Sequence, residues 1–183
     1  MSADGYVDVW AYYNQADTVE LYLNGKPLPT TAVLPHDTSL MCWRVKYEPG
    51  ELLAVAKRNG RVVRSASVCT AGKPAAIRLT PDRRVITADG VDLSYVTVEV
   101  VDSEGRLCPN ASNLIHFEVT GSAFIAGVDN GSPISLERFK DNKRKAFYGK
   151  CLLVVQNNGE AGKVSIKAMS DNLQSAATDI FCK

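Results

Sequence analysis

The sequence lacks a surplus of charge of either sign. Its 183 residues contain 21 lysines and arginines and 20 aspartates and glutamates, which gives a formal net charge of +1 at pH 7. It also lacks any apolar run near the roughly 20 residues that a membrane-spanning helix needs. Because neither charge nor hydropathy attracts the chain to a polyanion or a bilayer, we expect no nucleic-acid partner and no membrane partner.

Grouped cysteines and histidines are missing too. The five cysteines are widely spaced, odd in number and without a C-x-x-C pair, so small apolar or harmless surface thiols are the favoured interpretation. The two histidines, His36 and His116, are far apart, and no Ser-His-Asp or Cys-His spacing accompanies them. Glycines occur singly at turns, not in a phosphate-binding loop. The sequence therefore predicts no metal, no cofactor and no catalytic residue.

The pattern that is present is a period-two alternation of apolar and polar residues, which is typical of half-buried β-strands. Residues 7–13 alternate in this way. In residues 19–30, Asn24-Gly25 supplies the two positive φ angles of a type I′ turn, which predicts a β-hairpin. Two prolines shorten its return strand, because proline cannot donate a hydrogen bond to a neighbouring strand. A second hairpin is predicted about Asn59-Gly60.

The alternation breaks at residues 70–74, Thr-Ala-Gly-Lys-Pro, and resumes with a different rhythm. The later strand-like segments are residues 76–80, 85–87, 94–102, 114–120, 123–128, 146–156, 162–170 and 175–181. Such a series of short strands is typical of an immunoglobulin-like sandwich. The sequence thus predicts an all-β chain of two tandem immunoglobulin-like β-sandwich domains, residues 1–70 and 71–183. The first domain is small, so we expect it to depend on a neighbour.

Three aromatic residues, Trp10, Tyr12 and Tyr22, alternate with the apolar residues of their segments. If the two segments pair, the rings form one aromatic patch on the second face of the sheet. Such a patch can stack sugar rings, so these residues are candidate carbohydrate contacts. The preferred alternative is that this face packs on another domain, because exposed apolar patches often mark interfaces.

Two polar stretches have ordinary explanations. Asp129-Asn130-Gly131 lacks the ligand ladder of a calcium loop, and a plain turn is the favoured interpretation. Residues 138–145 are basic but contain a single aromatic residue, which favours a solvated loop between strands over a nucleic-acid site.

Four stretches carry a resemblance to a known family. They are ADTVELYLNG at residues 16–25, YEPGEL at 47–52, TAGKPAAIRLTPDR at 70–83 and GVDNGSP at 127–133. In this order they resemble the C-terminal region of bacterial β-galactosidases of glycoside hydrolase family 2. The resemblance covers nearly the whole chain. Residues 149–168 are also similar to the immunoglobulin-like repeats of bacterial adhesins.

The resemblance implies a part of a longer hydrolase. Family members carry a (β/α)8 barrel with two catalytic glutamates, followed by β-sandwiches such as these, and no catalytic position of the family has a counterpart in this chain. The implied function is a non-catalytic region that gives structural support, interdomain or oligomer contacts and active-site rim loops. Its implied partners are the catalytic barrel, the other domains of the parent hydrolase and galactosides. An independent carbohydrate-binding module and an adhesin-type tandem are the alternatives.

Overall fold

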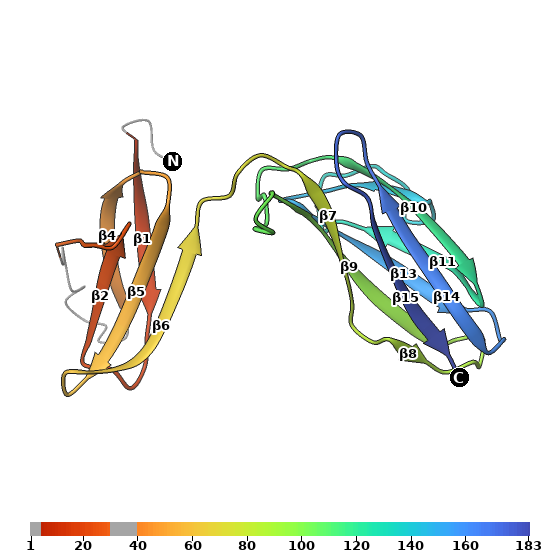
Figure 1. Ribbon diagram of the computed structural model, residues 1–183, viewed down its shortest axis with the longest axis horizontal. Helices are drawn as coiled ribbons and strands as arrows, with labels where there is room; N and C mark the ends of the chain where they lie inside the picture. Colours follow the sequence, from red (N-terminus) through yellow and green to blue (C-terminus); the bar gives the residue numbers. More distant parts are fainter. Residues whose placement is uncertain (1–4, 30–39) are drawn as a thin grey trace. The chain divides into compact units, whose positions relative to one another are not determined.

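The computed structural model describes residues 5–29 and 40–183, and these contain fifteen β-strands and no helix (Figure 1). The predicted all-β sandwich fold is confirmed. The chain divides into two compact units, Met1–Thr70 and Ala71–Lys183, which we call unit 1 and unit 2. That the units are independently folding domains stays a prediction.

The described residues of unit 1, 5–29 and 40–70, form six strands. They are β1 (Tyr6–Tyr12), β2 (Thr18–Leu23), β3 (Lys26–Pro27), β4 (Leu40–Lys46), β5 (Glu51–Arg58) and β6 (Arg61–Cys69). One sheet consists of β1 and β4, and the other has the order β3-β2-β5-β6. All four strand pairs among these described residues are antiparallel. Unit 1 is therefore a sandwich of two strands against four.

Both predicted hairpins of unit 1 are confirmed. Asn24 and Gly25 have φ of 51° and 76° between β2 and β3, and Asn59 and Gly60 have φ of 50° and 74° between β5 and β6. Asparagine and glycine tolerate these left-handed angles, which the type I′ turn requires. The return strand β3 ends at Pro27, as expected for a residue without an amide hydrogen. His36 lies outside the described residues.

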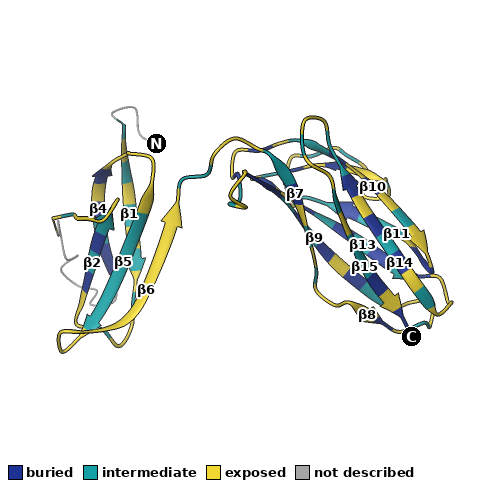
Figure 2. Ribbon diagram, in the orientation of Figure 1, coloured by how far each residue is buried: buried dark blue, intermediate teal, exposed yellow. Residues whose placement is uncertain are grey.

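The core of unit 1 lies between its two sheets and is small. Its buried residues are Val19, Leu21, Met41, Trp43 and Val45. Strand β6 takes no part in this core and is exposed along its whole length (Figure 2). The two-stranded sheet thus leaves one strand of the four-stranded sheet uncovered.

Unit 2 contains nine strands. They are β7 (Ala76–Pro81), β8 (Val85–Ile86), β9 (Leu93–Val101), β10 (Leu114–Gly121), β11 (Ala123–Asp129), β12 (Lys143–Lys145), β13 (Lys150–Asn157), β14 (Gly162–Met169) and β15 (Ala176–Cys182). The two sheets have the orders β12-β10-β14-β15-β8 and β11-β13-β9-β7. Only the β15–β8 pair is parallel among the described pairs. This pair and the bridge between Ala76 and Gln174 join the two ends of the unit.

The core of unit 2 follows from the alternation of its strands. Val96 and Val98 of β9 and Leu153 and Val155 of β13 are at most 1% exposed, and Ile166 of β14 faces them from the other sheet. Each inner face is therefore covered by the opposite sheet. The predicted segment 146–156 begins with a turn, not a strand, because Tyr148 and Gly149 have φ of 49° and 76°.

Candidate functional site

The first two carbohydrate candidates lie on the outer face of β1. Trp10 is 53% and Tyr12 78% exposed. Their strand pairs with β4, so that Trp10 lies opposite Cys42 and Tyr12 opposite Leu40. A common aromatic patch requires β1 to pair with β2. This pairing is wrong, because β2 lies in the other sheet.

Tyr22, the third candidate, lies on β2, in the sheet opposite Trp10 and Tyr12. Its hydroxyl donates to Glu20 Oε2, and Lys57 Nζ lies 2.6 Å from Glu20 Oε1. The bond to Glu20 raises the pKa of Tyr22, while the bonds from Lys57 and Tyr22 lower the pKa of Glu20. Tyr22 is therefore tied into a polar cluster of its own sheet. The role of the three residues in carbohydrate contact stays a prediction.

A groove of about 380 Å³ opens where β1 of one sheet faces β5 and β6 of the other. Its walls include Trp10, Tyr12, Leu52, Ala66 and Val68. The groove is mostly apolar and falls within the size range of small-ligand sites. No carboxylate belongs to its described lining, so it lacks the acid and nucleophile that glycoside cleavage requires.

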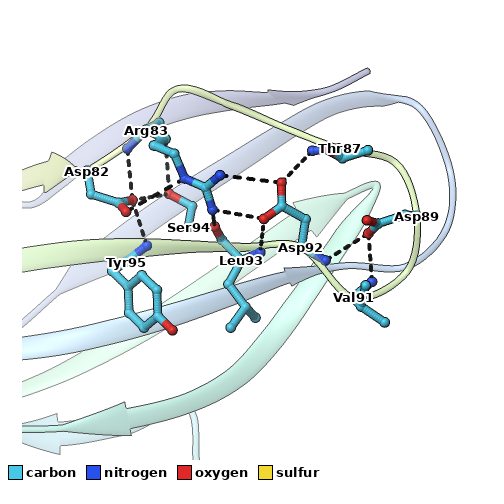
Figure 3. A network of polar contacts seen from close by, with 9 residues as sticks. All are labelled: Asp82, Arg83, Thr87, Asp89, Val91, Asp92, Leu93, Ser94 and Tyr95. Carbon is cyan, nitrogen blue, oxygen red and sulfur yellow. Dashed lines mark hydrogen bonds and ion pairs between the residues drawn. The ribbon is translucent and has the colours of Figure 1, made fainter.

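A network of hydrogen bonds joins the end of β7 to the start of β9 (Figure 3). Asp82 Oδ1 accepts the amide hydrogens of Arg83 and Tyr95, both at 2.8 Å. Asp92 Oδ1 accepts from Arg83 Nη2 at 2.8 Å, and Asp92 Oδ2 accepts from Thr87 N at 2.7 Å. We call this network the Asp92 clamp.

The protonation of Asp92 fits a structural role. The Thr87 amide, the Arg83 guanidinium and the Leu93 amide hold the pKa of Asp92 far below its ordinary range. Both carboxylate oxygens already accept hydrogen bonds. A carboxylate that is ionised at neutral pH and whose two oxygens both accept hydrogen bonds is a poor proton donor, so we interpret the Asp92 clamp as a lock on the turn between β8 and β9.

A second polar centre is formed around Arg144, which is only 1% exposed. Arg144 Nη2 donates to Asp129 Oδ1 at 3.2 Å and to Asn130 Oδ1 at 3.1 Å, and Nη1 donates to Glu137 O at 3.0 Å. Its Nε lies 3.9 Å from Glu137 Oε2, beyond hydrogen-bond range. The expectation of a wholly solvated basic loop is thus wrong at Arg144, which belongs to strand β12.

The residues between Asp129 and β12, which we call the 130–142 loop, carry apolar side chains that the sequence interpretation missed. Ile134 is 85%, Leu136 99% and Phe139 63% exposed. A signal for them was present, because Ile134 and Leu136 are large apolar residues in a stretch that no strand pattern continues. Asp129 is the last residue of β11, and Asn130 and Gly131 follow as irregular backbone with a φ of 69° at Gly131, so the turn lies at residues 133–134 and not at the predicted Asp129-Asn130-Gly131.

The remaining reactive side chains among the described residues are His116 and the five cysteines. His116 is exposed on β10, as expected. The five cysteines are free, and three of them, Cys108, Cys151 and Cys182, are buried. Burial raises the pKa of the Cys151 thiol to about 12, so that it is protonated at neutral pH.

Two features are absent from the part of the chain that the structure describes. Within 5–29 and 40–183, no three His, Cys, Asp or Glu side chains are grouped so that they could hold a metal ion. In the same part of the chain no helix is long and apolar enough to cross a membrane.

Comparisons with known proteins give the chain a context. Residues 77–179 match the glycoside hydrolase family 2 C-terminal domain 5, and residues 4–64 match a domain of unknown function, DUF4982. Beta-galactosidase BoGH2A of Bacteroides ovatus is 56% identical over 174 residues, which are 95% of this chain and 20% of that protein. A putative beta-glucuronidase of Formosa agariphila is 34% identical over 79% of this chain and 14% of its own length.

The fold comparison agrees. A glycosyl hydrolase family 2 member from Bacteroides cellulosilyticus superposes with a TM-score of 0.91 at 38% identity, over 97% of this chain and 23% of that one. The chain spans about a fifth or less of the length of these curated relatives. Because the family model covers more than half of the residues, the chain belongs to the glycoside hydrolase family 2 C-terminal domains.

Proposed function

We propose that the chain is the non-catalytic C-terminal part of a β-galactosidase, in which its two units support the enzyme and contact the catalytic barrel and other domains. The observation that carries the proposal is the similarity to a β-galactosidase along nearly all of this chain, which is only a fifth of that protein. The parent's catalytic residues then lie in the part that this chain does not contain.

The engagement of the chain's own carboxylates supports this function. Glycoside cleavage needs a protonated acid and a free nucleophile or base on opposite sides of the scissile bond. Asp82 and Asp92 are instead saturated by amides and Arg83, and Asp129 and Glu137 surround Arg144. These four carboxylates therefore serve contacts within unit 2.

An activity assay tests the proposal. We expect no hydrolysis of a nitrophenyl β-galactoside above the buffer rate by the purified 183-residue chain, and hydrolysis by a longer chain that includes the upstream barrel. Turnover by the purified chain that is abolished when one of its own carboxylates is changed would overturn it.

A carbohydrate-binding module is the second candidate, because the exposed Trp10 and Tyr12 both line the groove of unit 1. Exposed aromatic rings beside a groove suit the apolar face of a sugar. Tyr22, on the other sheet, would have to act separately or at a second surface.

Calorimetry with galactosides distinguishes the two candidates. A binding module predicts a Kd of about 1 mM or tighter that is lost in Trp10→Ala. Tyr47→Ala, at a partly exposed ring outside the groove lining, is the matched control. We expect no galactoside binding by the wild-type chain, and binding that survives in Tyr47→Ala but not in Trp10→Ala would favour the module.

A further inference from the structure

The 130–142 loop has a fixed backbone although it contains no strand. Val128 N donates to Phe139 O and Phe117 N donates to Asn142 O, both at 2.7 Å, so the later part of the loop is bonded to its neighbours on both sides. Arg144 fixes the start and the middle through Asn130 and Glu137. Loops of more than about 12 residues without secondary structure are uncommon in compact domains and are usually either functional or disordered. This one is held in place.

Glu137 braces the segment that carries the apolar side chains. Its Oε1 accepts Lys145 N at 3.1 Å, and its Oε2 accepts Ser135 Oγ at 3.1 Å. Ser135 lies between Ile134 and Leu136, so these two side chains project from a braced stretch of backbone. Their exposure is therefore built into the loop.

Ile134, Leu136 and Phe139, which we call the loop tip, leave a large apolar area in water. Single exposed apolar residues are ordinary, but three within six residues on an ordered loop are not. Phe139 has one contact within unit 2, because the guanidinium carbon of Arg144 lies 5.2 Å from the centre of its ring, and Ile134 and Leu136 are more exposed than Phe139. Burial against a partner would remove this area from water. The loop tip thus has the composition of the centre of an interface.

The surroundings of the loop tip are cationic. Arg138, Lys140, Lys143 and Lys145 are exposed, and within the described residues none of the four has an ion pair. Asp141, whose Oδ1 accepts Asn142 N, offsets one of these charges. The loop therefore presents an apolar centre with a surplus of unpaired positive charge around it.

We propose that the loop tip docks into an apolar surface rimmed by carboxylates on another domain of the parent glycosidase. This inference rests on the proposed function and names the segment of unit 2 that makes an interdomain contact. Exposed cations favour a partner surface of opposite charge, and exposed apolar side chains favour an apolar one. Most of each curated relative lies outside the stretch that this chain matches, and these further residues are enough for such a domain.

A rigid loop fits a preformed protein surface better than a bilayer. A backbone held in its docked form loses little conformational entropy on binding, and this gain depends on a partner of matching shape. The net charge of +1 gives the whole chain little attraction to anionic lipid. A protein partner is therefore the favoured occupant.

Hydroxyl-radical footprinting of side chains tests the docking. The free 183-residue chain is compared with the parent enzyme that contains it. We expect the labelling of Leu136 and Phe139 to fall about tenfold in the parent, because the centre of an interface excludes water. Val91, which is 69% exposed in the turn before β9, and Tyr148, which is 68% exposed, serve as internal references within the same unit.

Variants of the parent separate the two parts of the interface. In Ile134→Ser/Leu136→Ser, the labelling of Phe139 should return to the level of the free chain. In Lys140→Glu/Lys143→Glu, the labelling of Leu136 should rise at least about threefold, because the charges would repel a carboxylate rim. Val91→Ser is the control and should change neither. All these side chains are exposed, so the unfolding midpoint of the free chain should stay unchanged.

Other outcomes overturn the inference. Equal labelling of Leu136 in the free chain and in an active parent would refute the loop contact alone and leave the proposed function standing. Hydrolysis by the free chain would refute the proposed function instead. Protection of Leu136 in the free chain that grows with protein concentration would indicate a second copy as the occupant. Protection on addition of phosphatidylglycerol vesicles would indicate a membrane.

Discussion

Unit 1 and unit 2 are both sandwiches, but they cover their sheets to different extents. Unit 1 sets two strands against four and leaves β6 exposed, whereas unit 2 sets five strands against four. The buried core residues of unit 1 come from two strands, β2 and the facing β4, with partly buried residues of β1 and β5 packed against them. The buried core of unit 2 draws on both sheets and several loops. We therefore expect unit 1 to need a neighbouring domain that covers the exposed strand β6.

This contrast suits an accessory region. Unit 2 has a closed core, from which we expect that it folds alone, and it carries on its surface the loop for which we propose docking. Unit 1 has an open side, which we expect a neighbouring domain to cover. The groove beside β1 and the exposed β6 lie on that open side.

The largest expected effect comes from separating the units. Residues 71–183 alone should give dispersed amide signals in an NMR spectrum and a cooperative thermal transition. Residues 1–70 alone should give neither, because a domain of this size buries only about 60% of the surface of its unfolded chain. A cooperative melt of the isolated unit 1 would remove the contrast between the units.

Core and surface substitutions should follow the same contrast. Leu153→Ala in the closed core of unit 2 should lower the free energy of unfolding by about 3 kcal/mol, because Leu153 is fully buried. Val68→Ala on the inner face of β6 should cost less than about 0.5 kcal/mol, because Val68 is 73% exposed.

Urea titrations can assign each loss to its unit. Both tryptophans, Trp10 and Trp43, lie in unit 1, so tryptophan fluorescence follows unit 1 and far-ultraviolet circular dichroism follows both. A loss above about 1 kcal/mol for Val68→Ala would mean that β6 is packed in solution.

One turn in each unit places a non-glycine residue at a left-handed φ angle before a glycine, but the residue differs. Exchanging the two residue types measures what that angle costs. Unit 1 places Asn59 at φ 50°, whereas unit 2 places Tyr148 at φ 49° in the equivalent position before a glycine. Left-handed angles are costly for a bulky residue and mild for asparagine. Tyr148→Asn should therefore stabilise unit 2 by about 0.5–1 kcal/mol, part of the gain being offset by the lost contact with the Phe147 ring.

The reverse change, Asn59→Tyr, should destabilise unit 1 by a similar amount. Thermal unfolding monitored at the signals of each unit measures both effects. A fall in the midpoint of unit 2 in Tyr148→Asn would show that the tyrosine ring contributes more than its backbone angle costs.

The smallest expected effect concerns the Asp92 clamp, for which unit 1 has no counterpart among the described residues. The pKa of Asp92 is lowered in the folded state, so its contribution to stability is complete above about pH 4, where the unfolded carboxyl is ionised. The contribution is lost as the pH falls through the lowered value. Asp92→Asn should thus lower the unfolding midpoint at pH 7 by a few degrees, and the difference from wild type should shrink below pH 4. A difference independent of pH would contradict the role of the charge.

The sequence predicts local features of this fold well. Asn24-Gly25 and Asn59-Gly60 mark their turns because few other residues adopt the required angles. The pattern does not predict a second role of Asn24. The side chain of Asn24 also closes the neighbouring turn, accepting from Glu51 N at 2.9 Å and donating to Pro49 O at 3.1 Å.

Partners that are distant in the sequence were harder to predict. Alternation correctly assigns Trp10 and Tyr22 to the outer faces of their strands, but it does not say which strand lies beside which. The chain passes from β1 to the opposite sheet before it returns at β4, and this separates the predicted aromatic patch. The burial of Arg144 was invisible for the same reason, because its partner Asp129 lies fifteen residues away, across the 130–142 loop.

The joined ends of unit 2 have a consequence for the order in which it folds. Val85 and Ile86 pair with Phe181 and Cys182, and Ala76 bridges to Gln174, so the first strands of the unit meet the last. Contacts between such distant positions form late, since closing a long loop costs entropy before the contacts compensate for it. During synthesis the five-stranded sheet therefore stays incomplete until β15 has left the ribosome. A chain that ends before residue 174 would contain most residues of the apolar core but would lack β15, the strand that joins β14 to β8 in the five-stranded sheet.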